Sequence, residues 1–174
     1  MPHKAVVQEQ AIVDLSKLRY VRKVETQLVE DGTFEYFGKP LREALQIVNM
    51  VSRIGHKERE VAVVLFLDHS DMPIGYDLWT GGIDFVAIDA RQIFKLMSLL
   101  NASKVVFCHN HPEGRATPSR GDEMFCLQMC QLCKLMNWEV KDFIVVANPG
   151  YYSFKEQKNQ NLLDFEQGPA VILP

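Results

Sequence analysis

Two histidines and an aspartate lie close together in the sequence with the spacing of a metal site. His109 and His111 are two residues apart at the end of an apolar segment that has the composition of a strand. Because side chains along a strand repeat every second residue, both imidazoles can point to the same side. Asp122 follows in the first turn of a predicted helix. Two imidazoles and one carboxylate leave a tetrahedral position open, which is typical of a catalytic rather than a structural zinc site.

The same residues also have a purely structural interpretation. Ser119 and Asp122 nearly form a capping box, in which a serine begins a helix and an acidic residue stands three positions later. The histidines alone could be surface residues of a loop. The succession of His-x-His, a turn and Ser-x-x-Asp favours the metal site over this interpretation.

The segments around the motif predict a mixed α/β fold. Residues 61–67 and 104–109 are apolar without alternation, as expected of strands covered on both faces. The other predicted elements are a hairpin at 20–37, a helix from Pro40 to Gly55, a strand at 74–80, a helix capped by Asp89, a helix at 120–137, and strands at 139–147 and 151–154. This alternation predicts a mixed sheet with helices on its faces.

Length and composition fit one globular domain. The 174 residues are 47% hydrophobic, which is enough for a core without disulfides. We expect the domain at 39–155, an N-terminal arm and hairpin at 1–38, and a C-terminal tail at 156–174. The formal net charge of −3 gives no support to nucleic-acid binding through phosphate contacts.

The sequence predicts a cytoplasmic protein without a membrane segment. The first ten residues have no apolar region of a signal peptide, and no segment approaches the roughly 18 apolar residues of a membrane span. Three of the four cysteines, Cys126, Cys130 and Cys133, have the spacing of iron–sulfur ligands. They also fall on one face of a predicted helix, which favours reduced core cysteines.

The motif is similar to that of the JAB/MPN (JAMM) metallohydrolases. In that pattern a glutamate lies far upstream of His-x-His, seven residues, Ser, two residues and Asp. His109, His111, Ser119 and Asp122 fit this spacing, and the wording His-Asn-His-Pro-x-Gly-x-x-x-Pro-Ser resembles the RadC-like branch. The resemblance extends from Arg59 to Phe154. It implies a JAB1/MPN-like fold, with a cytidine-deaminase-like mixed sheet.

The resemblance also implies the roles of individual residues. One zinc ion per chain would be bound by His109, His111 and Asp122. Glu60 would be the general acid/base, and Ser119 would bind the attacking water or steady a developing oxyanion. Glu58 is the alternative to Glu60, which is preferred because it lies eight residues before Asp68, as in the family. No other cofactor is expected.

The sequence departs from the family pattern at a few positions. Family members often have serine where Glu113 stands, and histidine where Phe143 follows Asp142. Neither position is a ligand in the motif. The N-terminal helix-hairpin-helix module of longer relatives has no visible counterpart in this sequence, so their DNA-related roles transfer poorly.

We therefore expect a zinc-dependent metallopeptidase or isopeptidase that cleaves an amide bond of a peptide or protein. The first alternative is a metal-dependent DNA-processing protein or nuclease, which the net charge does not support. The second alternative is a non-catalytic scaffold, and the complete ligand set argues against it.

Overall fold

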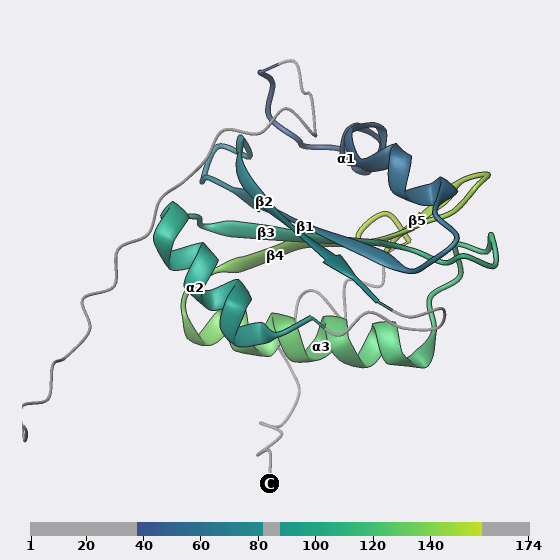
Figure 1. The fold of residues 1–174 in the computed structure, drawn as a ribbon. Helices are drawn as coiled ribbons and strands as arrows, with labels where there is room; N and C mark the ends of the chain where they lie inside the picture. The colour runs from purple at the N-terminus through teal and green to yellow at the C-terminus, as the bar shows by residue number, and fades with distance from the viewer. Residues whose placement is uncertain (1–37, 82–87, 158–174) are drawn as a thin grey trace, which may run out of the picture. The chain divides into compact units, whose positions relative to one another are not determined.

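The computed structural model describes residues 38–81 and 88–157. In this part of the chain, five strands form one mixed sheet with helices on both faces, which confirms the predicted fold class (Figure 1). The predicted hairpin at 20–37 lies outside the described residues, and the predicted domain boundaries stay a prediction. No described helix is long and apolar enough to cross a membrane. The predicted cellular compartment stays a prediction too.

The sheet places the start of one strand beside the end of another. Its strands, in the spatial order β2-β1-β3-β4-β5, are β1 (Val61–Leu67), β2 (Pro73–Thr80), β3 (Lys104–Asn110), β4 (Glu139–Val146) and β5 (Tyr151–Ser153). Only β3 and β4 are parallel, and α3 connects them. β1 and β3 are antiparallel, and Ala62 near the start of β1 is paired with His109 near the end of β3. Residues just before β1 therefore lie next to the histidine motif.

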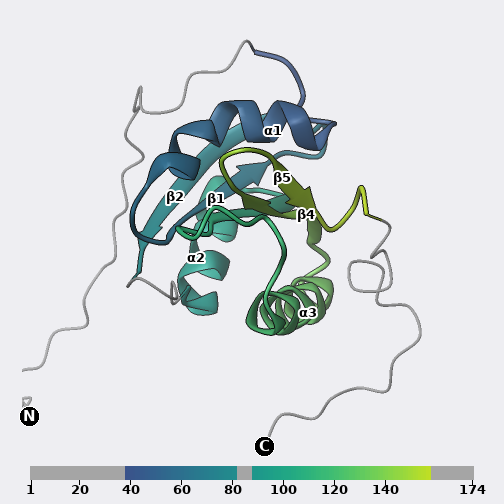
Figure 2. The ribbon, with the colours of Figure 1, turned by 90° about the vertical axis from the view of Figure 1, so that its right-hand side faces the viewer.

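The helices divide between the two faces of the sheet. They are α1 (Ala44–Val51), which continues as a 3-10 turn (Ser52–His56), α2 (Ala90–Leu100) and α3 (Arg120–Leu135). Figure 2 shows α1 on one face and α2 and α3 on the other. Asp89 is the N-cap of α2 as predicted, because its side chain accepts a hydrogen bond from the backbone N–H of Arg91. At the other end, Asn101 adopts a left-handed conformation that stops the helix.

The first helix begins later than predicted. Instead of Pro40 in its first turn, α1 has Glu43 as its N-cap. The backbone N–H of Leu41 donates to the carbonyl of Asp71 in the β1–β2 turn, with the two atoms 2.8 Å apart. This contact with a distant turn ties the residues before Glu43 to the sheet. The side-chain oxygen of Gln46 accepts hydrogen bonds from the N–H groups of Arg42 and Glu43, and it thereby caps the start of α1.

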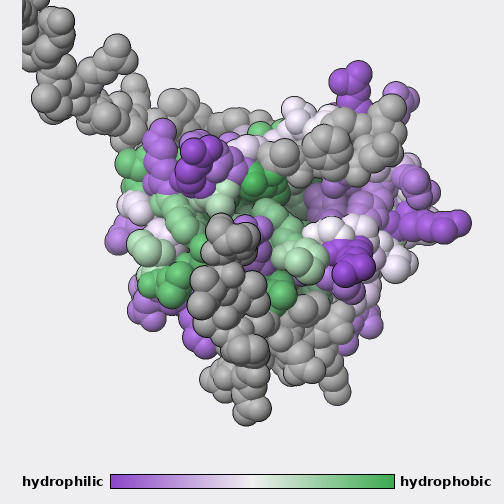
Figure 3. All heavy atoms as spheres, turned by 90° about the horizontal axis from the view of Figure 1, so that it is seen from below, coloured by the Kyte–Doolittle hydropathy of each residue, from purple (hydrophilic) through white to green (hydrophobic). Residues whose placement is uncertain are grey.

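A hydrophobic core fills the space on each side of the sheet. One core cluster lies against α2 and α3, and the other lies against α1. Cys126, Cys130 and Cys133 are buried in the first cluster, which confirms that they are core residues. Apolar side chains also gather on the outer face that carries α2 and α3 (Figure 3).

A charged cluster joins the β1–β2 turn to two other strands. Lys104 and Lys141 both place Nζ 2.7 Å from Oδ1 of Asp71, which has a left-handed backbone with φ of 68°. The Lys141 side chain is only 6% exposed. Burial alone would raise the pKa of Asp71, but the hydrogen bonds from the two lysines lower it overall.

We expect Asp71→Asn to lower the free energy of unfolding by roughly 1.5–3 kcal/mol, because it removes a charged acceptor from two lysines. Asparagine tolerates the left-handed conformation, so the change tests the charge. Urea unfolding at neutral pH gives the measurement. Glu139→Gln is the control, since this exposed carboxylate lies 4.0 Å from Lys104.

The effect should depend on pH. Because the folded protein lowers the pKa of Asp71, its stabilising contribution is present above the usual carboxylate pKa of about 4 and is lost as the pH falls through the lowered value. The difference between wild type and Asp71→Asn should therefore shrink in acid. A difference below about 0.5 kcal/mol at neutral pH would contradict this role.

Candidate metal centre

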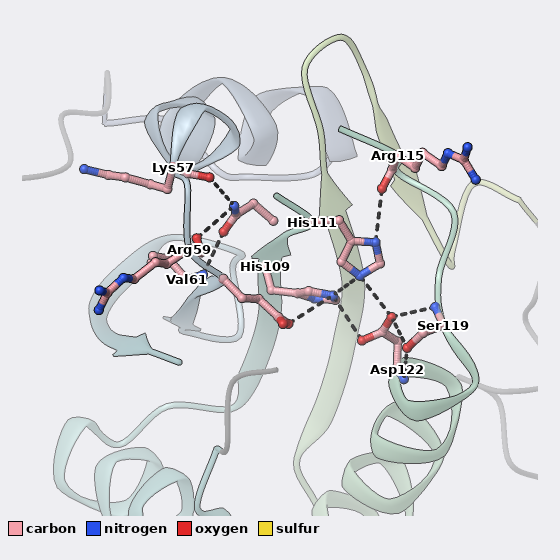
Figure 4. A network of polar contacts seen from close by, with 10 residues as sticks. Lys57, Arg59, Val61, His109, His111, Arg115, Ser119 and Asp122 are labelled. Atoms are coloured by element: carbon pink, nitrogen blue, oxygen red, sulfur yellow. Dashed lines mark hydrogen bonds and ion pairs between the residues drawn. The ribbon is translucent and has the colours of Figure 1, made fainter. Parts of the chain in front are cut away.

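The sequence-predicted ligands meet where β3 ends and α3 begins. After His111 the chain turns away and then returns in α3, whose first turn carries Asp122. One ligand atom from each of His109, His111 and Asp122 lies within 4.8 Å of the others (Figure 4). Across the described residues, no other group of three or more His, Cys, Asp or Glu side chains meets in this way.

The separations between the ligand atoms fit one small cation. Nε2 of His109 lies 3.0 Å from Nε2 of His111 and 3.0 Å from Oδ1 of Asp122. Nε2 of His111 lies 3.3 Å from Oδ2 of Asp122. Ligand atoms around a tetrahedral zinc ion, with bonds of about 2.0–2.1 Å, stand roughly 3.3 Å apart. The three side chains could therefore hold a metal ion with little movement.

A backbone carbonyl sets the protonation of one ligand. Nδ1 of His111 lies 3.0 Å from the carbonyl oxygen of Arg115. A carbonyl only accepts hydrogen bonds, so Nδ1 must carry the proton and donate it. In the neutral ring, Nε2 then presents its lone pair toward Asp122 and His109, as a metal ligand must.

Ser119 fixes the third ligand. Oδ2 of Asp122 accepts hydrogen bonds from the backbone N–H of Ser119 at 2.6 Å and from its hydroxyl at 2.8 Å. The backbone N–H of Asp122 donates back to Oγ of Ser119 at 3.2 Å. The capping box is therefore present together with the ligand cluster. Asp122 therefore helps to cap α3, as the structural interpretation predicts, and is also a candidate metal ligand.

Hydrogen bonds within the cluster shift the pKa values of Asp122 and His111. Burial alone would raise the pKa of Asp122, but hydrogen bonds from His109 and His111 lower it below its usual range. Hydrogen bonding to Asp122 raises the pKa of His111 in turn. Asp122 therefore stays ionised, whereas a proton on His111 must leave before a cation binds.

Of the two candidate acid/base residues, the structure brings Glu60 to the cluster. Glu60 directly precedes β1 and is 8% exposed, and its Oε1 lies 3.9 Å from Nε2 of His109. Glu58 is exposed. The antiparallel pairing of β1 with β3 explains this placement. Ala62 is paired with His109, so Glu60, two residues before Ala62, lies beside the end of β3.

The residue between the two histidines has a role that the sequence analysis missed. Asn110 is fully buried, and its side-chain oxygen accepts from the N–H of Val61 at 2.7 Å. Its side-chain N–H groups donate to the carbonyls of Lys57 and Arg59, each at 3.2 Å. The amide thus fixes the backbone on both sides of Glu60. The strand period could have predicted this role, because it places the residue between His109 and His111 on the opposite, buried face of the sheet.

An open cavity of about 570 Å³ adjoins the cluster. Glu60, the three candidate ligands and Ser119 lie on its polar side. Phe107, Phe125 and Phe143 line its apolar side. The ring of Phe143 lies edge-on to His109, with 5.4 Å between the ring centroids. The candidate metal centre is therefore accessible and has an apolar wall.

Comparison with known proteins agrees with this geometry. Residues 41–160 match the family of RadC-like JAB domains. The chain is also similar to a UPF0758 protein of Actinobacillus succinogenes, with 34% identity over 153 residues. That similarity covers 87% of this chain, and the chain spans 64% of the length of the relative. Both similarities include the segment that carries the candidate ligands.

We expect His109→Ala and Asp122→Ala each to abolish stoichiometric metal binding, because two ligands cannot replace a three-ligand site. Elemental analysis of protein purified without chelator is the measurement, with about one metal ion per chain expected in wild type. His69→Ala is the matched control, since this histidine is exposed in the turn after β1. Metal retained in both ligand variants would contradict the assignment.

We expect Ser119→Ala to weaken metal binding roughly tenfold or more, because it removes the hydroxyl that orients the Asp122 carboxylate. Chelator competition gives the affinity. Ser119→Thr keeps both the hydroxyl and the helix cap, so it should restore affinity. Equal affinities in wild type and Ser119→Ala would show that the backbone N–H suffices to hold Asp122.

Proposed function

The chain belongs to the family of RadC-like JAB domains, and we propose that it is a metal-dependent hydrolase that uses zinc to cleave an amide bond in a peptide or protein. The observation that carries this proposal is the position of Glu60, whose carboxylate lies beside a cluster of three candidate ligands at an open cavity. A binding scaffold would have no need for a buried carboxylate at that position.

The donor set supports zinc as the metal. Two imidazole nitrogens and one carboxylate oxygen suit zinc better than magnesium or calcium, which prefer oxygen ligands. Three protein ligands also leave one coordination position for water or substrate. When bound, the ion would supply Lewis acidity and activate a water molecule.

The chain's own residues would supply proton transfer and orientation. Glu60 would take the proton of the attacking water and give it to the leaving nitrogen. Asn110 would hold Glu60 in place through its three backbone hydrogen bonds. Ser119 directs its hydroxyl at Asp122, so we assign it to the orientation of that ligand. Its part in steadying an oxyanion stays a prediction.

A peptide pool tests the proposed reaction. The zinc-loaded full chain is incubated with a mixture of peptides and isopeptide-linked peptides, and new termini are identified by mass spectrometry. Labelled single-stranded and duplex DNA are incubated in parallel. Metal-dependent cleavage of peptides supports the proposal. Cleavage of DNA alone would replace it with the nuclease alternative, and no cleavage of either would favour the scaffold.

We expect Glu60→Gln to reduce turnover about a hundredfold or more while the metal content stays at the wild-type level, because the amide cannot accept the proton. Turnover is measured on the cleaved peptide and metal by elemental analysis. Glu58→Gln is the matched control, two residues away and exposed. Full turnover in Glu60→Gln would remove this residue from the mechanism.

A further inference from the structure

We propose that the cavity beside the metal centre is a subsite for a large apolar side chain of the substrate, next to the bond that is cleaved. This inference rests on the proposed function. It adds to that function a class of substrate, in which the residue at the scissile bond is aromatic or a large aliphatic one.

Three aromatic rings form the apolar wall. Phe107 lies two residues before His109 on β3 and therefore on the same face of the sheet. Phe143 is the partner of Phe107 on β4, with 6.0 Å between the ring centroids. The ring centroid of Phe125 lies 5.4 Å from that of Phe107 and 5.9 Å from that of Phe143. The three rings thus form one cluster beside His109, in which Phe107 and Phe143 are buried and Phe125 is partly exposed.

Two of the three rings share a secondary-structure element with a candidate ligand. Phe125 lies three residues after Asp122 on α3, so both side chains are on one side of the helix. β3 likewise carries both His109 and Phe107. The distance from the wall to the metal centre is therefore fixed by secondary structure. A ligand that reaches the metal would place its neighbouring group against these rings.

The cavity has room for a large apolar side chain. Ala62 lines it from β1, and it is the smallest side chain in a strand otherwise made of Val, Leu and Phe. The volume of about 570 Å³ falls within the range of small-ligand sites, roughly 300–1,000 Å³. Phe125 is partly exposed there. The exposed part of this lining favours an apolar ligand, because binding would remove that surface from water.

Two hydroxamates that share a metal-binding head test the subsite without any need for turnover. Calorimetry gives their affinities for the zinc-loaded full chain. 3-Phenylpropanohydroxamate should bind roughly ten- to a hundredfold more tightly than acetohydroxamate, because its phenyl group would be buried in the cavity. In Phe125→Ala this ratio should fall to within about threefold. Leu135→Ala is the matched control, because this residue of α3 is 82% exposed, and it should keep the wild-type ratio.

Each outcome has a separate meaning. Equal affinities of the two hydroxamates for wild type would overturn the subsite and leave the proposed function standing. A wild-type ratio in folded Phe125→Ala, with folding checked by thermal melting, would also overturn it. If neither hydroxamate binds to zinc-loaded protein, the metal has no open position, and the proposed function fails together with the subsite. The wild-type comparison decides the matter even if Phe125→Ala does not fold.

Discussion

The pairing of β1 with β3, reinforced by one buried amide, is the constraint on which the rest of the centre depends. Asn110 joins the end of β3 to the segment before β1 through three hydrogen bonds. Its neighbours His109 and His111 point away from it, toward Asp122. One strand end therefore fixes two candidate ligands on one side and the backbone around Glu60 on the other. A buried amide that lost these partners would incur a desolvation cost, so the arrangement is held firmly.

The sequence predicted much of this arrangement because the relevant signals are local. The apolar run at 61–67, the His-x-His spacing and the Ser-x-x-Asp helix start each depend on neighbouring residues, and the structure has all three. What could not be predicted depends on contacts between distant segments. The start of α1 is set by a hydrogen bond from Leu41 to Asp71, and the charges around Asp71 come from strands 33 and 70 residues away. Periodicity carries no information about such contacts.

The helix cap and the candidate ligand share one carboxylate. Asp122 completes the capping box of α3 with Ser119 and at the same time faces both histidines. The stability of the first turn of α3 and the geometry of the centre are therefore coupled. Such sharing explains why a sequence motif can look purely structural and still carry chemistry. Oδ2 of Asp122 accepts from Ser119 and also lies 3.3 Å from Nε2 of His111, while Oδ1 lies 3.0 Å from Nε2 of His109.

This shared carboxylate has a consequence for ion selectivity. Both oxygen atoms of Asp122 face the cluster, but Oδ2 also accepts two hydrogen bonds from Ser119. Acceptor sites of Oδ2 are therefore taken up by Ser119, so Asp122 would favour coordination of a cation through Oδ1 alone. Large cations such as calcium, which take six to eight oxygen atoms and often a bidentate carboxylate, find too few donors in this arrangement. The helix cap would therefore favour an ion of low coordination number, because Ser119 restrains the carboxylate that would hold it.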